Sequence, residues 1–150
     1  MPDLESVKSG HVFISYVSDD SKLVDKLQND LENAGVSVWR DRTSLGPGDR
    51  WKDSIRSAIA AGAFFICCFS GESRRRIKSY MNEELALAIE ELRVRNRDQV
   101  WFIPVVFPGG EIPNRQIDAS ENLRDFNYVL LSSANWEKGI GQLLSAIQGS

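Results

Sequence analysis

Hydrophobic residues follow two alternating patterns along the chain. Short apolar or β-rich runs have the length and composition of strands, at residues 12–16, 36–39, 63–69, 100–107 and 128–131. Apolar residues with helical spacing separate most of these runs. The run 63–69 is apolar without alternation, which is typical of a central strand covered on both faces. The chain is therefore predicted to alternate strands with helices.

The helical pattern over residues 79–92 is the most informative. Its apolar stripe consists of Met81, Leu85, Ala88, Ile89 and Leu92. At about 100° per residue, Glu83 lies opposite this stripe, whereas Glu84 lies on the border between core and water. Ser79 can cap the first turn, and the helix dipole favours an ionised carboxylate at Glu84. The alternative is that Glu83 and Glu84 are only solubilising charges.

Turn and capping residues mark the ends of the other elements. The cluster Val17-Ser-Asp-Asp-Ser21 contains helix-capping side chains, and Gly35 closes the following helix. Pro104 removes one ladder hydrogen bond from the fourth strand and suggests an edge, a bulge or an early end. A short helix is predicted near residues 121–126, and a last amphipathic helix over 136–147.

This order of elements predicts an α/β, flavodoxin-like fold: a five-stranded parallel sheet in the order 2-1-3-4-5 with helices on both faces. Residues 1–10 are predicted to form a disordered or extended tail, and residues 11–150 a single domain. Ligands of such sheets bind outside the carboxyl ends of the strands. Ser15, Tyr16, Asp41 and the loop after Ser70 should gather there, beside the start of the Glu84 helix.

Composition and charge exclude several classes of function. The 150 residues are 42% hydrophobic and 26% charged, as in one ordinary domain, and the net charge of −3 argues against nucleic acid as a direct partner. The longest apolar run, 58–69, is shorter than the roughly 18 residues of a membrane span. The polar N-terminus lacks a secretory signal, which predicts a cytoplasmic protein. Cys67 and Cys68 are adjacent and are expected to be small buried hydrophobes rather than metal ligands.

Several known site motifs are absent. Neither a G-x-G-x-x-G nor a G-x-x-x-x-G-K motif occurs, and His11, the sole histidine, precedes the first strand. A phosphorelay receiver would need an aspartate at the end of the third strand, where this chain has Cys68-Phe69-Ser70. What remains is Glu84 with polar and aromatic neighbours. A single carboxylate can stabilise an oxocarbenium-like state when the leaving group is good, as pyridinium nicotinamide is.

Five motifs occur in an order and spacing that resemble a known family. They are Phe13–Tyr16 with Ser18–Asp20, Gly35–Trp39 leading to Asp41, Leu45–Gly48 with Trp51, Tyr80–Leu85, and Ile103–Val105. From His11 to Ile147 the chain resembles a TIR (Toll/interleukin-1 receptor) domain of the bacterial type. The family also has a proline in its fourth strand, which explains Pro104 better than strand propensity does.

The resemblance implies an enzyme that consumes NAD+ as a substrate and needs no metal or other cofactor. Glu84 would be the catalytic residue that promotes nicotinamide release, leaving ADP-ribose or a cyclic isomer. Residues Ser15, Tyr16, Asp41, Trp51 and Tyr80 would line the pocket. Many enzymatic members have tryptophan where this chain has Tyr80. Taken alone, Trp51 and Asp41 also suit structural roles, in the core and in a turn.

The resemblance implies self-association as well, in which a loop of one copy completes the site of the next. The residues of this assembly loop are Leu45, Gly46, Pro47 and Gly48. Two readings stay open: an NAD+-cleaving effector of bacterial antiphage defence, and an interaction module that binds TIR domains or imitates those of a host. Because no sensor is evident, we expect a longer effector with a sensing region after residue 150.

Overall fold

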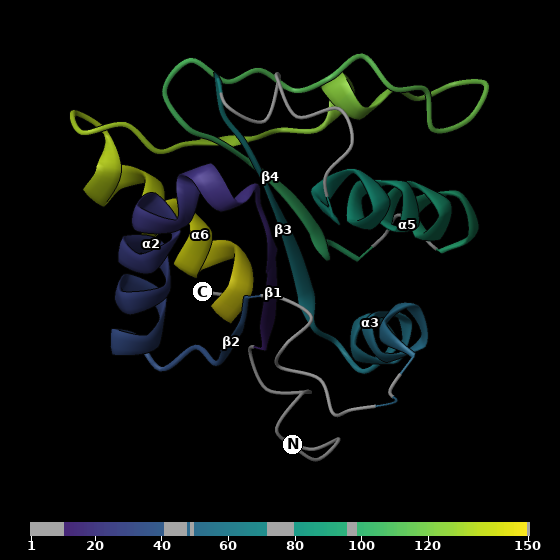
Figure 1. Ribbon diagram of the computed structural model, residues 1–150, viewed down its shortest axis with the longest axis horizontal. Coiled ribbons are helices and arrows are strands. Elements are labelled where there is room, and N and C mark those ends of the chain that lie inside the picture. Colours follow the sequence, from purple (N-terminus) through teal and green to yellow (C-terminus); the bar gives the residue numbers. More distant parts are fainter. Residues whose placement is uncertain (1–10, 41–47, 49, 72–79, 96–98, 150) are drawn as a thin grey trace.

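The computed structural model describes residues 11–40, 48, 50–71, 80–95 and 99–149, and of residues 80–82 only the backbone (Figure 1). At its centre is a five-stranded parallel sheet in the order β2-β1-β3-β4-β5, which confirms the predicted fold class. The strands are β1 (Val12–Ser15), β2 (Val38–Trp39), β3 (Phe64–Phe69), β4 (Phe102–Val106) and β5 (Val129–Leu130). The predicted tail 1–10 lies outside the described residues.

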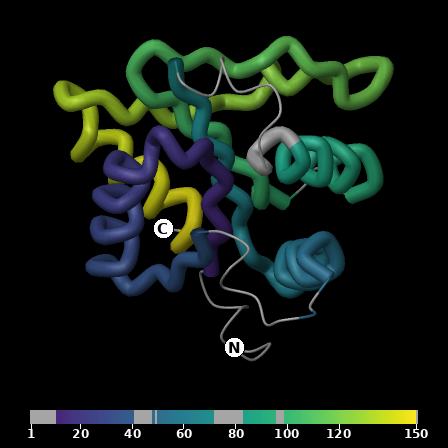
Figure 2. The backbone as a smooth tube through the Cα atoms, viewed as in Figure 1, coloured from purple at the N-terminus to yellow at the C-terminus, as the bar shows by residue number. Residues whose placement is uncertain are grey.

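Helices cover both faces of the sheet (Figures 1 and 2). One face carries α2 (Ser21–Asn33) and α6 (Trp136–Gln148), and the other carries α3 (Trp51–Ala60) and α5 (Tyr80–Val94). The sheet divides the buried hydrophobic residues into two clusters, one under each helix pair. Among the described residues, no helix has both the length and the apolarity needed to cross a membrane.

Strand alternation decides which side chains face which helix pair. Phe13, Phe65 and Phe69 belong to the cluster under α3 and α5, whereas Ile14 and Ile66 belong to the cluster under α2 and α6. Because successive side chains of a strand point to opposite faces, Ser15 points toward α5. Cys67 points to that same face and Cys68 to the other.

Pro104 lies in an interior strand, in contrast to the edge, bulge or early end that its ring suggested. β4 pairs with β3 from Phe65↔Phe102 to Phe69↔Val106, and with β5 only from Val105↔Val129. Phe107 N–H bonds to β3, and Val106 C=O accepts from Leu131 after β5. Alternation along β4 therefore directs the nitrogen of Pro104 toward the β5 side, ahead of the first β4–β5 pair. No ladder hydrogen bond is lost there.

The ends of the helices agree only in part with the capping pattern. Gly35 has a φ of +92° and its N–H donates to Glu32 C=O, so it closes α2 as predicted. Asp20 ends the short helix η1 (Ser18–Asp20) and occupies the N-cap position of α2, but its side chain makes no cap hydrogen bond. The predicted short helix near 121–126 is the 3-10 helix η3 (Leu123–Asp125), which Asn122 caps.

Candidate functional site

Glu84 lies in the first half of α5, next to the carboxyl end of β1. Its side chain is only 5% exposed, whereas the neighbouring Glu83 is exposed. Ser15, the last residue of β1, donates a 2.6 Å hydrogen bond from its Oγ to Oε1 of Glu84. The outward position of Glu83 is as predicted, and Glu84 is more buried than the predicted border position. A buried carboxylate is retained because polar groups stabilise its charge.

Cys67 adjoins the Ser15–Glu84 pair on β3. Ser15 and Cys67 are register partners of adjacent parallel strands, and both are fully buried. Burial raises the pKa of the Cys67 thiol well above its ordinary value, and the charges of Cys68 and Glu84 raise it further, while a hydrogen bond with Ser15 opposes the shift. Cys67 is therefore a neutral thiol at physiological pH.

A charged network ties α5 to α3. Glu91 is 7% exposed and accepts from Arg56 Nε at 3.3 Å on one oxygen and from Arg95 Nε at 3.0 Å on the other. Arg56 also donates from Nη2 to Glu90 at 3.2 Å. Because Arg56 belongs to α3, these bonds connect the helix that carries Glu84 to the helix that begins with Trp51. The network therefore helps to position both helices beside the sheet.

A second buried carboxylate lies at the same end of the sheet. Asp20 is 5% exposed and accepts a 2.6 Å hydrogen bond from Oγ of Ser70, the residue that follows β3. Burial raises the pKa of the neighbouring Cys68 thiol, and the charge of Asp20 raises it further. This pair links the segment after β1 to the end of β3.

Glycines allow the loop after β4 to pack against the end of β3. A Cβ on Gly110 would lie 2.2 Å from the carbonyl oxygen of Phe69 and 2.8 Å from Cα of Ser70, which no side chain can occupy without a backbone shift. Gly109, with a φ of +79°, lies against Gly71. The backbone around Ser70 is thus held in two ways. The glycines after β4 pack closely against it, and the Ser70 hydroxyl donates to Asp20.

Tyr16 points to the opposite face of the sheet from Glu84. It packs against the cluster under α2 and α6, and its hydroxyl accepts a 3.1 Å bond from Nε of Arg40. The guanidinium of Arg40 lies 5.0 Å from the Tyr16 ring centroid and donates to Asp25 and to the Ser21 carbonyl. Burial lowers the pKa of Arg40, but its hydrogen bonds with Asp25 and Tyr16 outweigh burial and raise the pKa.

The other predicted site residues have different outcomes. Trp51 is half-buried at the start of α3 and packs on the cluster under α3 and α5, the same face of the sheet as Glu84. Asp41, the Tyr80 side chain, Leu45, Gly46 and Pro47 lie outside the described residues. Gly48 is described, and its φ of +85° suits a turn. The structure thus brings Ser15 into contact with Glu84, and the substrate roles of all these residues stay predictions.

Sequence reasoning missed three features of the site: the Asp20–Ser70 pair, the pairing of Cys67 with Ser15 in strand register, and the Arg40–Tyr16 pair. Asp20 is a residue type that commonly caps helices, so the sequence does not indicate its tertiary partner Ser70. Cys67 could have been found from strand register, because β1 and β3 are neighbours in the predicted sheet and both residues lie near the carboxyl ends. Arg40 has no sequence pattern that points to it.

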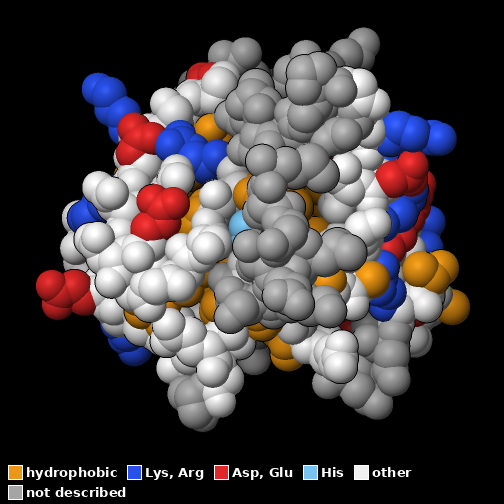
Figure 3. Space-filling view, turned by 90° about the horizontal axis from the view of Figure 1, so that it is seen from below, with side chains coloured by type: hydrophobic (Ala, Val, Ile, Leu, Met, Phe, Trp, Pro, Cys, Tyr) orange, Lys and Arg blue, Asp and Glu red, His pale blue; other side chains and the backbone are white. Residues whose placement is uncertain are grey.

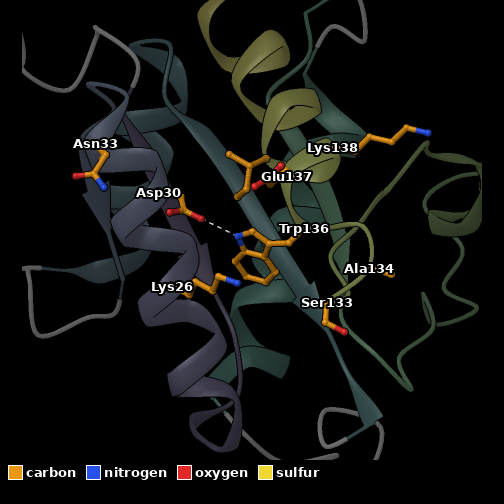
Figure 4. A pocket seen from close by; sticks show the side chains of 9 residues that line it. Lys26, Asp30, Asn33, Ser133, Ala134, Trp136, Glu137 and Lys138 are labelled. Carbon is orange, nitrogen blue, oxygen red and sulfur yellow. Dashed lines mark hydrogen bonds between the residues drawn. The ribbon is translucent and has the colours of Figure 1, made fainter.

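Two surface hollows lie away from Glu84. One, of about 820 Å³, lies between α2 and α6, where Trp136 Nε1 donates a 2.7 Å bond to Asp30 and Lys26 lies over the indole (Figure 4). The other, of about 690 Å³, lies at the amino ends of the strands and is bordered by the exposed Val94 and Val100. Figure 3 shows this end of the molecule, with hydrophobic side chains at the surface next to charged ones.

Comparisons with known proteins agree with this architecture. The family model of the TIR domain matches residues 12–144. A curated protein, NAD(+) hydrolase PdTIR of Paracoccus denitrificans (strain Pd 1222), is 36% identical over 69 residues, which are 45% of this chain and 23% of that protein. The matched stretch therefore spans less than a quarter of the relative's length.

Two solved structures share the fold. The TIR domains of the activated Roq1 resistosome, which directly recognises the effector XopQ, align with a TM-score of 0.61 at 19% identity, over 91% of this chain and 98% of that one. A prokaryotic SEFIR domain aligns with a TM-score of 0.55 at 18% identity, over 91% of this chain and 97% of that one.

Proposed function

The chain belongs to the TIR domain family, and we propose that it cleaves NAD+ to nicotinamide and ADP-ribose, or to a cyclised isomer of ADP-ribose, with Glu84 as the catalytic residue. The observation that carries this proposal is the carboxylate of Glu84, which is buried beside the carboxyl end of β1 and hydrogen-bonded by Ser15 at 2.6 Å. The partial match to a bacterial protein named as an NAD(+) hydrolase supports the same substrate.

The chemistry needs one negative charge near the reacting sugar. When the bond between ribose C1′ and the nicotinamide nitrogen breaks, its electron pair leaves with the nicotinamide, which becomes neutral. The ribose then carries positive charge, and the ionised Glu84 stabilises this charge electrostatically. In hydrolysis, the oxygen of a water molecule bonds to C1′ and its proton passes to solvent. In cyclisation, a nucleophile of the same molecule takes the place of water.

The proposal includes self-association and a biological setting. The loop of Leu45, Gly46, Pro47 and Gly48 from one copy would complete the site of the next, so that assembly switches on the activity. Such a switch suits an effector that depletes NAD+ in bacterial antiphage defence. Activity should accordingly rise more steeply than in proportion to protein concentration.

A second candidate is an interaction module that has no catalytic activity and binds other TIR domains. One observation favours it: Glu84 is only 5% exposed and already has Ser15 as a hydrogen-bond donor, as a structural carboxylate would. The two functions differ in a simple measurement, because only the enzyme releases nicotinamide.

The test follows free nicotinamide by chromatography. Concentrated protein is incubated with NAD+, with and without a crowding agent, and Glu84→Gln is run beside the wild type. Loss of the charge that stabilises the cation should lower the rate by about 100- to 1000-fold. Glu83→Gln is the matched control, because Glu83 is the adjacent exposed glutamate on the same helix, and it should retain the wild-type rate.

The second product distinguishes hydrolysis from cyclisation. If the wild type releases no nicotinamide in samples whose light scattering shows assembly, the NAD+-cleaving function is wrong and the interaction module replaces it. Equal rates in Glu84→Gln and the wild type would instead remove Glu84 from the catalytic role.

A further inference from the structure

The edge strand β2 is too short to direct the chain that follows it. β2 has two residues, and its ladder with β1 ends at the pair Phe13↔Trp39, although β1 continues to Ser15. The residue after the ladder is Arg40, the last described residue before the segment 41–47. The direction in which the chain leaves the sheet is therefore set at Arg40 and by what its side chain contacts.

The guanidinium of Arg40 bonds to two neighbouring elements at once. Its Nε donates to the Tyr16 hydroxyl at 3.1 Å, and its Nη2 donates to the Ser21 carbonyl at 3.1 Å. Its Nη1 donates to Asp25 and, at 3.4 Å, to Gln28. The guanidinium also lies 5.0 Å from the centroid of the Tyr16 ring. Tyr16 follows β1 and the other three partners lie on α2, so these five residues form an anchor for the end of β2, the Arg40 anchor.

The Arg40 anchor depends on the shape of arginine and not only on its charge. A guanidinium presents its N–H groups in a fixed planar fork, whereas a lysine ammonium is a point charge on a flexible stem. All three nitrogens of Arg40 donate here. The side chain of Asp25 is 64% exposed, so its ion pair with Arg40 adds little to overall stability. The anchor is therefore better suited to fixing local geometry than to stabilising the fold.

We propose that Arg40 and Tyr16 are positioning residues for self-association: they fix the direction in which the chain leaves β2 toward the assembly loop of Leu45 to Gly48. Tyr16 then acts from the face of the sheet opposite Glu84 and does not touch the substrate. This role differs from the pocket-lining role that the family resemblance implies. The effect on activity rests on the proposed function and its self-association, whereas the Arg40 anchor itself does not.

The Arg40 anchor is tested without any activity, by NMR hydrogen exchange of backbone amides in dilute protein. Arg40→Lys keeps the charge but loses the fork, so the amides that pair β1 with β2 should exchange about twofold to tenfold faster. Amides that pair β3 with β4 should exchange as in the wild type. Arg50→Lys is the control, because the Arg50 side chain is 87% exposed. Equal exchange of the β1–β2 amides in Arg40→Lys and the wild type would show that the anchor does not exist.

The role in self-association is tested by how nicotinamide release depends on protein concentration. Tyr16→Phe keeps the ring but loses the acceptor for Arg40, so the protein concentration that gives half-maximal specific activity should rise about twofold to tenfold. KM for NAD+ at saturating protein should not change. Tyr128→Phe is the control, because Tyr128 is 56% exposed and precedes β5, at the other edge of the sheet. Melting temperatures should stay within about 4 °C of the wild type.

The outcomes separate the anchor, its role and the proposed function. A raised KM in Tyr16→Phe at every protein concentration would place Tyr16 against the substrate and overturn the positioning role. An unchanged concentration dependence in both Tyr16→Phe and Arg40→Lys would overturn it as well. If the wild type releases no nicotinamide, NAD+ cleavage fails, and light scattering measures the same shift as self-association. A wild type that does not associate at any concentration would end the positioning role, and hydrogen exchange alone then decides whether the anchor exists.

Discussion

Two serine–carboxylate pairs lie at the carboxyl end of the sheet, and their local chemistry is nearly the same. Ser15 donates to Glu84 and Ser70 donates to Asp20, each at 2.6 Å, and both carboxylates are 5% exposed. Ser15 is the last residue of β1, and its partner Glu84 lies on α5, which follows β3. Ser70 comes directly after β3, and its partner Asp20 lies in the segment that follows β1. The two pairs thus join the connection after β1 to β3, and the connection after β3 to β1.

The difference between the pairs lies in their surroundings. Glu84 projects from a long helix on the face of the sheet that also carries Trp51, whereas Asp20 ends a three-residue helix that leads into α2. Burial and a hydroxyl donor are therefore not enough to identify a catalytic carboxylate. The surrounding elements, together with the family motif at Tyr80–Leu85, are what favour Glu84.

The largest expected effect separates the two carboxylates by function. Asp20→Asn should leave the rate of nicotinamide release per folded molecule within about threefold of the wild type, while Glu84→Gln lowers it by about 100- to 1000-fold. Asp20→Asn should instead lower the free energy of unfolding by about 1 kcal/mol, because its bond from Ser70 loses the strength that the charge adds. Rate assays and urea unfolding measure the two effects. Equal losses of activity in both variants would make Asp20 part of the reacting machinery.

A smaller effect concerns the support of the Asp20–Ser70 pair. Gly110→Ala should lower the free energy of unfolding by about 1 to 3 kcal/mol, because the new Cβ would lie 2.2 Å from the Phe69 carbonyl oxygen and force the backbone beside Ser70 to move. Gly141→Ala is the control: it lies within α6 with no atom near its Cβ position, and it should be neutral or stabilising. Equal stabilities of the two variants would show that the close packing at Gly110 does not hold the strand end.

The last effect depends on pH and concerns the two buried thiols. Burial raises the pKa of both Cys67 and Cys68 above the ordinary thiol value. Below the pKa of a thiol in the unfolded chain, about 8.5, the buried thiols contribute their full stabilisation. Above this pH the thiols ionise only in the unfolded chain, so the stabilisation is lost as pH rises. Between pH 9 and 10, each thiol should remove about 1.4 kcal/mol per pH unit from the free energy of unfolding. Urea unfolding of the wild type and of the Cys67→Ala, Cys68→Ala double variant measures this loss, and identical pH slopes would contradict it.

Most of the fold could be predicted from the sequence because it depends on local patterns. Each predicted apolar run contains a strand of the structure, and the apolar stripe of α5 identified four of its buried residues, Leu85, Ala88, Ile89 and Leu92. Capping predictions were weaker, since the Asp20 side chain takes a partner 50 residues away instead of the helix amides. Pro104 was also misleading, because its effect on the sheet depends on which side of β4 is paired at that residue.

The candidate site was predictable in part. The helical wheel separated Glu84 from Glu83 because both belong to one helix with one periodicity. The sequence pattern assigned both Ser15 and Tyr16 to the site, although adjacent residues of a strand point to opposite faces. In the structure, Tyr16 lies beside Arg40 and Ser15 lies beside Glu84. The same alternation puts Cys67 next to Ser15, but only once the register of β1 and β3 is known.

The sequence by itself determined the class of fold, the order of the elements, the buried face of α5, and the family to which the chain belongs. These follow from hydrophobic periodicity and from short motifs, which act over a few residues. The tertiary structure decided the partners of the buried polar groups: Ser15 with Glu84, 69 residues apart, and Trp136 with Asp30, 106 residues apart. The reason is that a hydrogen bond needs two groups within about 3 Å, and only the packing of helices onto a registered sheet sets distances that closely.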